Sequence, residues 1–283
     1  MYQFRIEMFN LKKTRMNHNS IFSRLWNDYT LQNPSAGKIH DLFTGEGELV
    51  KNDHIAFRTF NDPRIDISVL SKIFLENGYE ERGQYIFKDK HLFAKHFEHK
   101  SDTEAPRVFI SQLILEDFSQ FLQNTIKNAI NMVPAQKYTS KDLIFAGSLF
   151  PNPSFETYNK LRVESEYAAW LYVFGFRANH FTISINALKK YDTIEKVNEF
   201  VKIHGFSLNT SGGEIKGTKE ELLRQSSTLG DRIKIQFTEG EYEIPACYYE
   251  FAQRYADKDG RIYSGFIAKS ADKIFESTDF KSS

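Results

Sequence analysis

Two histidines and one glutamate have the residue types and the placement of a metal site. His54, in DHIAFRTF, and His180, in NHFTISIN, each begin a run of alternating apolar residues, and Glu250 lies in the apolar run PACYYEFAQR. Neutral imidazoles and a carboxylate suit divalent iron, and three protein ligands on one face leave positions open for substrate and oxygen. A single histidine on a strand is more often an ordinary core or surface residue, so the prediction requires that the three side chains converge.

Three further side chains could contact a substrate. Arg58 follows His54 by four residues, so both share one face of a strand, about 13 Å apart. A buried arginine needs an anion, which is either a substrate carboxylate or an acidic residue of the chain itself. Ser111 and Gln112, in FISQLIL, end the first half of the chain as Glu250 ends the second, and either could hydrogen-bond a substrate or be a plain strand residue. No catalytic residue beyond the metal ligands is indicated.

The two histidines occupy equivalent positions of an internal repeat. ISVLSKIFLENGY from Ile67 matches TIEKVNEFVKIHGF from Thr193, and both place apolar residues along one helical stripe. Gly78 and Gly205 follow these stripes, where a residue in the left-handed conformation commonly ends a helix. Chance similarity between two ordinary β-α segments is the alternative explanation. Alternation predicts strands at 85–88, 92–97 and 107–115 in the first half, and at 232–237, 245–251 and, more weakly, 214–217 in the second.

These units predict an α+β fold in which two β-α-β-β-β modules form a curved, barrel-like mixed sheet around a central metal cavity. Extra helices are expected at 18–31, 118–132 and 155–173, the first ending before Pro34. We expect a single domain, 1–283, divided into an N-terminal helical segment 1–52, a first module 53–116, a helical connector 117–178, a second module 179–255 and a C-terminal segment 256–283.

Composition excludes several functional classes. Lys and Arg together number 37, as do Asp and Glu, and no basic stripe suggests a nucleic-acid partner. No apolar run approaches the length of a transmembrane helix, and the N-terminus does not resemble a secretory signal. The single cysteine, Cys247, excludes an internal disulfide and fits a cytoplasmic protein. No serine nucleophile elbow, phosphate loop or dinucleotide fingerprint is found.

Four motifs carry a resemblance to a known family. NDHIAFRTF, ESEYAAWLYVFGFRANHFTISIN, IPACYYEFAQR and GFIAKSADKIFEST resemble the family described as DUF1338, whose better-characterised members are 2-oxoadipate dioxygenase/decarboxylases of lysine catabolism. That family is related in fold to the vicinal oxygen chelate superfamily, which includes glyoxalase I and the extradiol dioxygenases. The resemblance implies that His54, His180 and Glu250 hold the iron and that Arg58 contacts the substrate.

The resemblance also implies the reaction. An Fe(II)-dependent dioxygenase/decarboxylase would convert a 2-oxo diacid, 2-oxoadipate, with O2 into 2-hydroxyglutarate and CO2, and zinc or another divalent ion could replace iron in a crystal. Ser270, in AKSADK, is the candidate equivalent of a substrate contact in the C-terminal part of the longer bacterial members. The alternatives are a non-redox metal-dependent lyase, isomerase or hydrolase of glyoxalase type, and a non-catalytic ligand-binding module.

Overall fold

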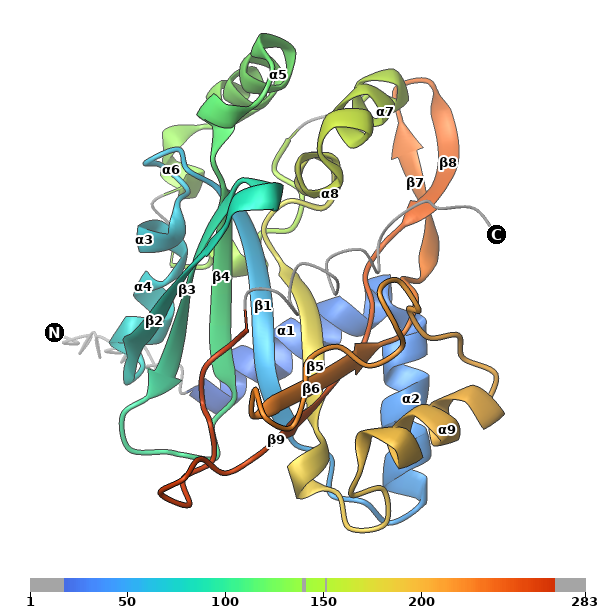
Figure 1. Ribbon diagram of the computed structural model, residues 1–283. Helices are drawn as coiled ribbons and strands as arrows, with labels where there is room; N and C mark the ends of the chain where they lie inside the picture. The colour runs from blue at the N-terminus through green and yellow to red at the C-terminus, as the bar shows by residue number, and fades with distance from the viewer. Residues whose placement is uncertain (1–17, 139–140, 151, 268–283) are drawn as a thin grey trace, which may run out of the picture.

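A curved sheet of seven strands forms the centre of the computed structural model, which describes residues 18–138, 141–150 and 152–267. The strand order is β2-β3-β4-β1-β5-β9-β6, and a separate hairpin, β7–β8, stands beside the sheet (Figure 1). The predicted Ser270 lies outside the described residues. The strands are β1 (Asn52–Phe60), β2 (Tyr79–Phe87), β3 (Leu92–His99), β4 (Arg107–Leu113), β5 (Ala178–Ser184), β6 (Leu223–Ser227), β7 (Arg232–Phe237), β8 (Gly240–Pro245) and β9 (Glu250–Arg254).

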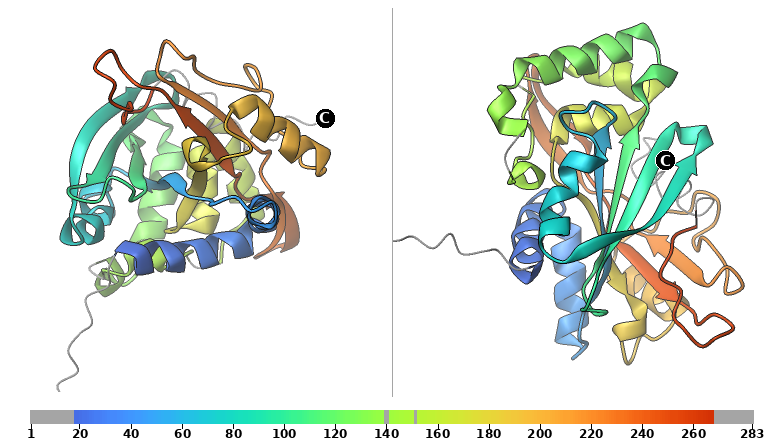
Figure 2. Two further views of the ribbon diagram at one scale, coloured as in Figure 1. Left: turned by 90° about the horizontal axis from the view of Figure 1, so that it is seen from below. Right: turned by 90° about the vertical axis from the view of Figure 1, so that its left-hand side faces the viewer.

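The helices cover one face of this sheet and both of its ends. α1 crosses behind β1 and β5, while α3 and α4 pack beside β2 and β4 (Figures 1 and 2). None of the helices described is both long enough and apolar enough to cross a membrane. The helices are α1 (His18–Gln32), α2 (Pro34–Gly45), α3 (Ile67–Leu70), α4 (Lys72–Glu76), α5 (Gln120–Met132), α6 (Ala135–Tyr138), α7 (Phe155–Glu164), α8 (Glu166–Phe174) and α9 (Ile194–Ile203).

The two halves of the sheet meet where β1 pairs with β5. This pairing is antiparallel and sets Ala56 opposite His180 and His54 opposite Thr182. On either side, β1 pairs in parallel with β4, and β5 pairs in parallel with β9. The same pattern therefore repeats outward from the β1–β5 pair, and the predicted curved, mixed sheet is confirmed as a half-barrel.

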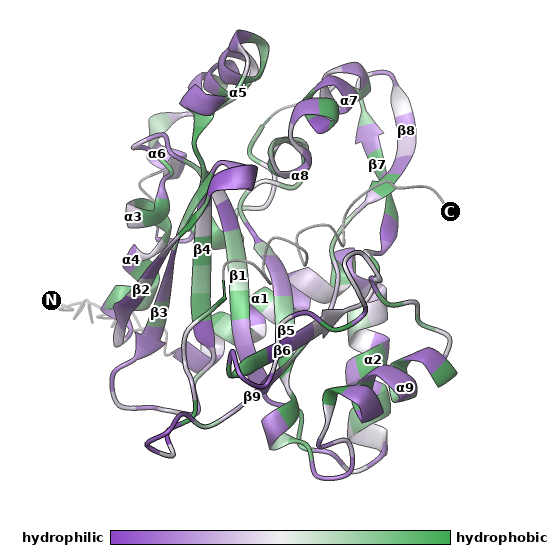
Figure 3. Ribbon diagram, viewed as in Figure 1, coloured by the Kyte–Doolittle hydropathy of each residue, from purple (hydrophilic) through white to green (hydrophobic). Residues whose placement is uncertain are grey.

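Alternate residues of β1 and β5 face opposite sides of the sheet. On the helix-covered side, the Phe57 ring contacts Phe74 of α4, with ring centroids 5.5 Å apart, and the Phe181 ring contacts Trp26 of α1 at 5.1 Å. Hydrophobic and hydrophilic bands alternate along the central strands in Figure 3. Because side chains alternate along a strand, His54, Arg58 and His180 project together from the opposite, concave face.

The second module differs from its predicted strands. β6 was not predicted, residues 232–237 form β7 of the separate hairpin, and Lys216 makes only an isolated bridge to Gln225. The predicted strand at 245–251 is interrupted, because partners outside the sheet take its backbone groups. The Cys247 N–H donates to the Asn33 side chain at 2.7 Å, and the Tyr249 N–H donates to the Thr228 hydroxyl at 3.0 Å.

Capping side chains explain where the helices differ from prediction. The helix predicted at 155–173 is divided, because Ser165 has an extended backbone (φ −154°) and its hydroxyl accepts from the Ala168 N–H at 3.2 Å, so that it caps α8. Helix α2 was not predicted, since Pro34 ends α1 but also occupies the first turn of a new helix, where proline is favoured. The helix after β1 is likewise divided, into α3 and α4, at Ser71.

The matched glycines of the two modules allow a test of backbone strain. Gly78 (φ +94°) and Gly205 (φ +85°) are both left-handed, but a Cβ at Gly78 would lie 2.6 Å from His99 Nε2, whereas nothing lies within 4 Å at Gly205. We expect Gly205→Ala to lower the free energy of unfolding by about 1–2 kcal/mol, and Gly78→Ala by at least about 1 kcal/mol more, through overpacking. Urea unfolding of both variants measures this, and equal losses would contradict the predicted clash.

Candidate metal centre

The side chains of His54, His180 and Glu250 converge on the concave face of the sheet. Their ligand atoms all lie within 4.8 Å of one another, and the three residues are 2%, 5% and 1% exposed. His54 Nε2 is 3.5 Å from Glu250 Oε1, and His180 Nε2 is 3.3 Å from Glu250 Oε2. Donors about 2.0–2.2 Å from one divalent ion are separated by roughly 3–4 Å. These side chains therefore fit a single bound ion.

Strand register explains this convergence. His54 and His180 come from the paired strands β1 and β5, and Glu250 begins β9, where it pairs with Thr182. The Thr182 hydroxyl also lies 3.1 Å from His54 Nε2. All three candidate ligands thus project from adjacent strands of one continuous sheet, which fixes their separations without any loop.

Each histidine is oriented by the residue that precedes it. His54 Nδ1 lies 2.8 Å from Asp53 Oδ1, and His180 Nδ1 lies 3.0 Å from Asn179 Oδ1. A partner at Nδ1 fixes the tautomer and leaves Nε2 as the ligand atom. Sequence reasoning missed both residues, although the signal was present, because an aspartate or asparagine stands before the histidine in both repeats.

Asp53 also anchors the C-terminal part of the described chain. Arg254 donates to both Asp53 oxygens, at 2.7 and 2.9 Å, and to the carbonyls of Tyr263 and Gly265 at 3.0 and 2.8 Å. Burial would raise the pKa of Asp53, but the charge of Arg254 and the hydrogen bonds from His54 and Arg254 together outweigh it and hold this pKa below its usual range. The segment so anchored carries the Phe266 ring to 4.8 Å from the His54 ring, which it covers.

Burial sets the protonation of the three candidate ligands. It raises the pKa of Glu250 to about 8, although a hydrogen bond from the Gln225 side chain opposes this shift. Burial also lowers the pKa of His54 and, more strongly, that of His180. At neutral pH the imidazoles are therefore neutral and able to bind a cation, whereas the carboxyl must lose its proton first.

Arg58 lies beside the three candidate ligands and is held by helix α8. It is 3% exposed, and its guanidinium lies 5.0 and 5.3 Å from the ring centroids of Tyr167 and Trp170. Tyr167 is fixed by donating to the Ser111 carbonyl at 2.7 Å, and Trp170 by donating to the Ala246 carbonyl at 2.9 Å. The charge of Arg58 also contributes to the low pKa of His180, after the larger effects of burial and of His54.

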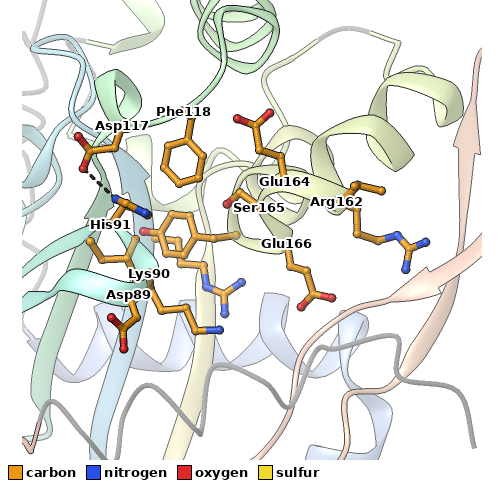
Figure 4. Close-up of a pocket in the computed structure, with 13 residues that line it drawn as sticks. Asp89, Lys90, His91, Asp117, Phe118, Arg162, Glu164, Ser165 and Glu166 are labelled. Carbon is orange, nitrogen blue, oxygen red and sulfur yellow. Dashed lines mark hydrogen bonds and ion pairs between the residues drawn. The ribbon is translucent and has the colours of Figure 1, made fainter.

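A cavity of about 570 Å³ leads from the surface to Arg58 and Tyr167. On one side it is bounded by His91, whose Nδ1 lies 3.0 Å from an Asp117 oxygen. The junction between α7 and α8, with Glu166, bounds it on the other side (Figure 4). A ligand entering this cavity from solvent would thus meet Arg58.

The position equivalent to Glu250 in the first module is Phe109. Glu250 pairs with Thr182, two residues after His180, and Phe109 pairs with Ala56, two residues after His54. The expectation that Ser111 or Gln112 is this counterpart is therefore wrong. Ser111 pairs with Arg58, and its hydroxyl lies 3.0 Å from the Tyr167 hydroxyl.

Gln112 faces the helices rather than the metal centre. Its side-chain carbonyl accepts from the Ile67 N–H at 3.2 Å, at the start of α3. Gln253 of the second module does the same for Ile194 of α9, also at 3.2 Å. These equivalent bonds fix the first helix of each module to its last strand. The predicted substrate contact of Gln112 is corrected accordingly, since its amide carbonyl is engaged on the opposite face of the sheet.

Two imidazoles and a carboxylate on the concave face of a curved sheet define a candidate mononuclear metal centre. The family model described as 2-oxoadipate dioxygenase/decarboxylase matches residues 22–148 and 144–262. The chain belongs to the 2-oxoadipate dioxygenase/decarboxylase family.

Named relatives agree with this assignment. The chloroplastic 2-oxoadipate dioxygenase/decarboxylase of Arabidopsis thaliana is 32% identical over 92% of this chain and 76% of that protein. The rice hydroxyglutarate synthase, solved in complex with 2-oxoadipate, is 32% identical with a TM-score of 0.84, over 92% of this chain and 91% of that one. A Shewanella frigidimarina protein with a provisional hydrolase name is 48% identical with a TM-score of 0.85, over 89% and 98% of the two chains.

The fold extends to more distant proteins. A glyoxalase superfamily protein of Ralstonia eutropha matches with a TM-score of 0.74 at 18% identity, over 88% of this chain and 85% of that one. At that identity the comparison shows the fold alone.

Proton release should accompany metal binding. Because the pKa of Glu250 is about 8 and those of the histidines are lowered, a divalent ion displaces about one proton at pH 7 and almost none above about pH 9. Below about pH 8 the affinity should fall roughly tenfold per pH unit. Calorimetry in buffers of different ionisation enthalpy measures the proton count. Glu250→Gln should abolish the release, and a wild-type count near zero or two at pH 7 would contradict this assignment.

Proposed function

We propose that this chain is an Fe(II)-dependent dioxygenase/decarboxylase of 2-oxo diacids that converts 2-oxoadipate and O2 into 2-hydroxyglutarate and CO2. The observation that carries the proposal is the convergence of the buried side chains of His54, His180 and Glu250, whose ligand atoms lie within 4.8 Å of one another. Family membership supports the reaction, and the rice relative was solved with 2-oxoadipate.

The donor set supports iron as the metal. His54, His180 and Glu250 would hold it on one face, as two histidines and one carboxylate do in non-haem iron oxygenases. Fe(II) bound there would supply open coordination positions and the redox chemistry that couples O2 to the oxidation of a 2-oxo acid. Phe109, in the position equivalent to Glu250, offers no further ligand, so this chain leaves those positions to substrate and O2.

The surrounding residues would bind the diacid and exclude water. Arg58 presents a planar pair of donors that suits a carboxylate, and Tyr167 and Trp170 hold that plane in place. Phe266 covers His54, and the Tyr248 ring stacks on His180 with centroids 4.8 Å apart. These contacts orient the substrate between Arg58 and the metal in a site of low polarity.

Two broader proposals accompany the reaction. We propose one domain built of two modules, 53–116 and 179–255, because β4 and β9 pair in equivalent ways with the first strand of each module. A cytoplasmic location of this chain remains a prediction, and the Arabidopsis relative is named as chloroplastic.

Oxygen dependence tests the reaction. Iron-loaded protein given 2-oxoadipate in air should consume one O2 and release one CO2 for each 2-hydroxyglutarate formed, whereas anaerobic samples should release none. An oxygen electrode and mass spectrometry of the products measure this. Turnover without oxygen in zinc-loaded protein would contradict the proposal and favour a hydrolase or lyase, as the provisional name of the Shewanella protein suggests.

Replacement of Arg58 tests how the diacid is held. Arg58→Lys keeps the charge but loses the planar pair of donors, so we expect KM for 2-oxoadipate to rise about 10- to 100-fold with metal content unchanged. Arg64→Lys is the matched control, because Arg64 pairs with Asp62 at the protein surface, and it should change KM by less than about twofold. Equal KM values for the two variants would rule out the proposed role of Arg58.

A further inference from the structure

Tyr248 places a phenol next to both a candidate metal ligand, His180, and Arg58. Its ring stacks on the His180 ring, with centroids 4.8 Å apart and an angle of 26° between the planes. The residue is 1% exposed and precedes Glu250 by two positions. Tyr29 donates a hydrogen bond to the Tyr248 carbonyl, which fixes its backbone against helix α1. The ring is thus held from two sides, while the role of its hydroxyl has still to be explained.

The Tyr248 hydroxyl has a proton to donate. Among the residues that the structure describes, no hydrogen-bond acceptor is found for this buried oxygen. Arg58 lies beside it, but a guanidinium only donates hydrogen bonds. Arg58 can therefore donate to the phenol oxygen but cannot accept from the phenol O–H. A buried donor without an acceptor is costly. An anionic oxygen bound at Arg58 would lie next to the phenol and accept a hydrogen bond from its hydroxyl.

We propose that Tyr248 is a further substrate-binding residue, whose hydroxyl donates to the same substrate carboxylate that Arg58 holds. This inference rests on the proposed function, because it takes the ligand to be a 2-oxo diacid. Guanidinium and phenol together form a clamp with two kinds of donor. The stack on His180 fixes the clamp relative to the metal, so it also sets the direction in which the diacid lies.

Tyr249 provides an internal control. It is also 1% exposed, and its hydroxyl likewise has no partner among the described residues. Its ring, however, packs on the opposite side of the chain, with centroids 5.6 Å from Trp26 of α1 and 5.8 Å from Phe251. Removing this hydroxyl changes the same chemical group at the same depth of burial, away from the candidate metal centre.

Anaerobic calorimetry of Fe(II)-loaded protein with 2-oxoadipate tests the clamp. We expect Tyr248→Phe to weaken binding about 10- to 100-fold, the cost of a hydrogen bond to a charged group, and Tyr249→Phe by less than about twofold. Metal content and melting temperature should match the wild type in both variants. If the wild type binds 2-oxoadipate tightly and Tyr248→Phe binds it equally well, the clamp is overturned but the proposed function is not. Failure of the wild type to bind 2-oxoadipate would overturn the proposed function, and the clamp with it.

A double-mutant cycle separates the clamp from a general effect on structure. If both residues hold one carboxylate, Tyr248→Phe should cost less than about threefold in an Arg58→Lys background, where the carboxylate is no longer fixed. A full penalty in both backgrounds, or loss of iron together with affinity, would show that Tyr248 acts through the fold and would overturn the proposal.

Discussion

The antiparallel pairing of β1 with β5 is the constraint on which the candidate site depends. It sets His180 opposite Ala56, so that His54 and His180 leave adjacent strands on the same face. A shift of this pairing by one residue would turn His180 toward the helices and bring Phe181 into the cavity. The parallel pairing of β9 then adds Glu250 beside them. The geometry of the site is thus a property of sheet register, which the packed aromatic rings on the helix side hold in place.

Buried polar groups are costly, and each candidate ligand has a specific partner that reduces this cost. Asp53 and Asn179 accept from the histidines, and Gln225 donates to Glu250. Asp53 carries a charge of its own, which the buried guanidinium of Arg254 balances in an ion pair at 2.7 Å. The candidate ligands are therefore oriented before any ion arrives, and little reorganisation is needed when one binds.

Short-range patterns predicted the repeat, the curved mixed sheet, and the residues His54, His180, Glu250 and Arg58. The second module was harder to predict, because Ala246–Tyr249 has the apolar character of a strand but gives its backbone bonds to partners distant in sequence, such as Asn33. Gln112 was assigned to the wrong face for a similar reason. Only the register of β1 with β4 shows that it lies opposite Thr59 rather than Arg58. Asp53 and Asn179 were overlooked although each directly precedes a repeat histidine, whereas the contact of Tyr248 with His180 is one that no spacing in one sequence reveals.

The difference between Phe109 and Glu250 bears on how such a centre evolves. The two modules share a backbone plan, yet one contributes a single candidate ligand and the other contributes two. After gene duplication, a mutation at the position of Phe109 or of Glu250 changes the number of protein ligands. It thereby changes how many coordination positions of the ion stay open to small molecules, while the sheet is unaltered. One ancestral half-barrel could in this way give rise to descendants that bind the same element but differ in how many small molecules can reach it at once.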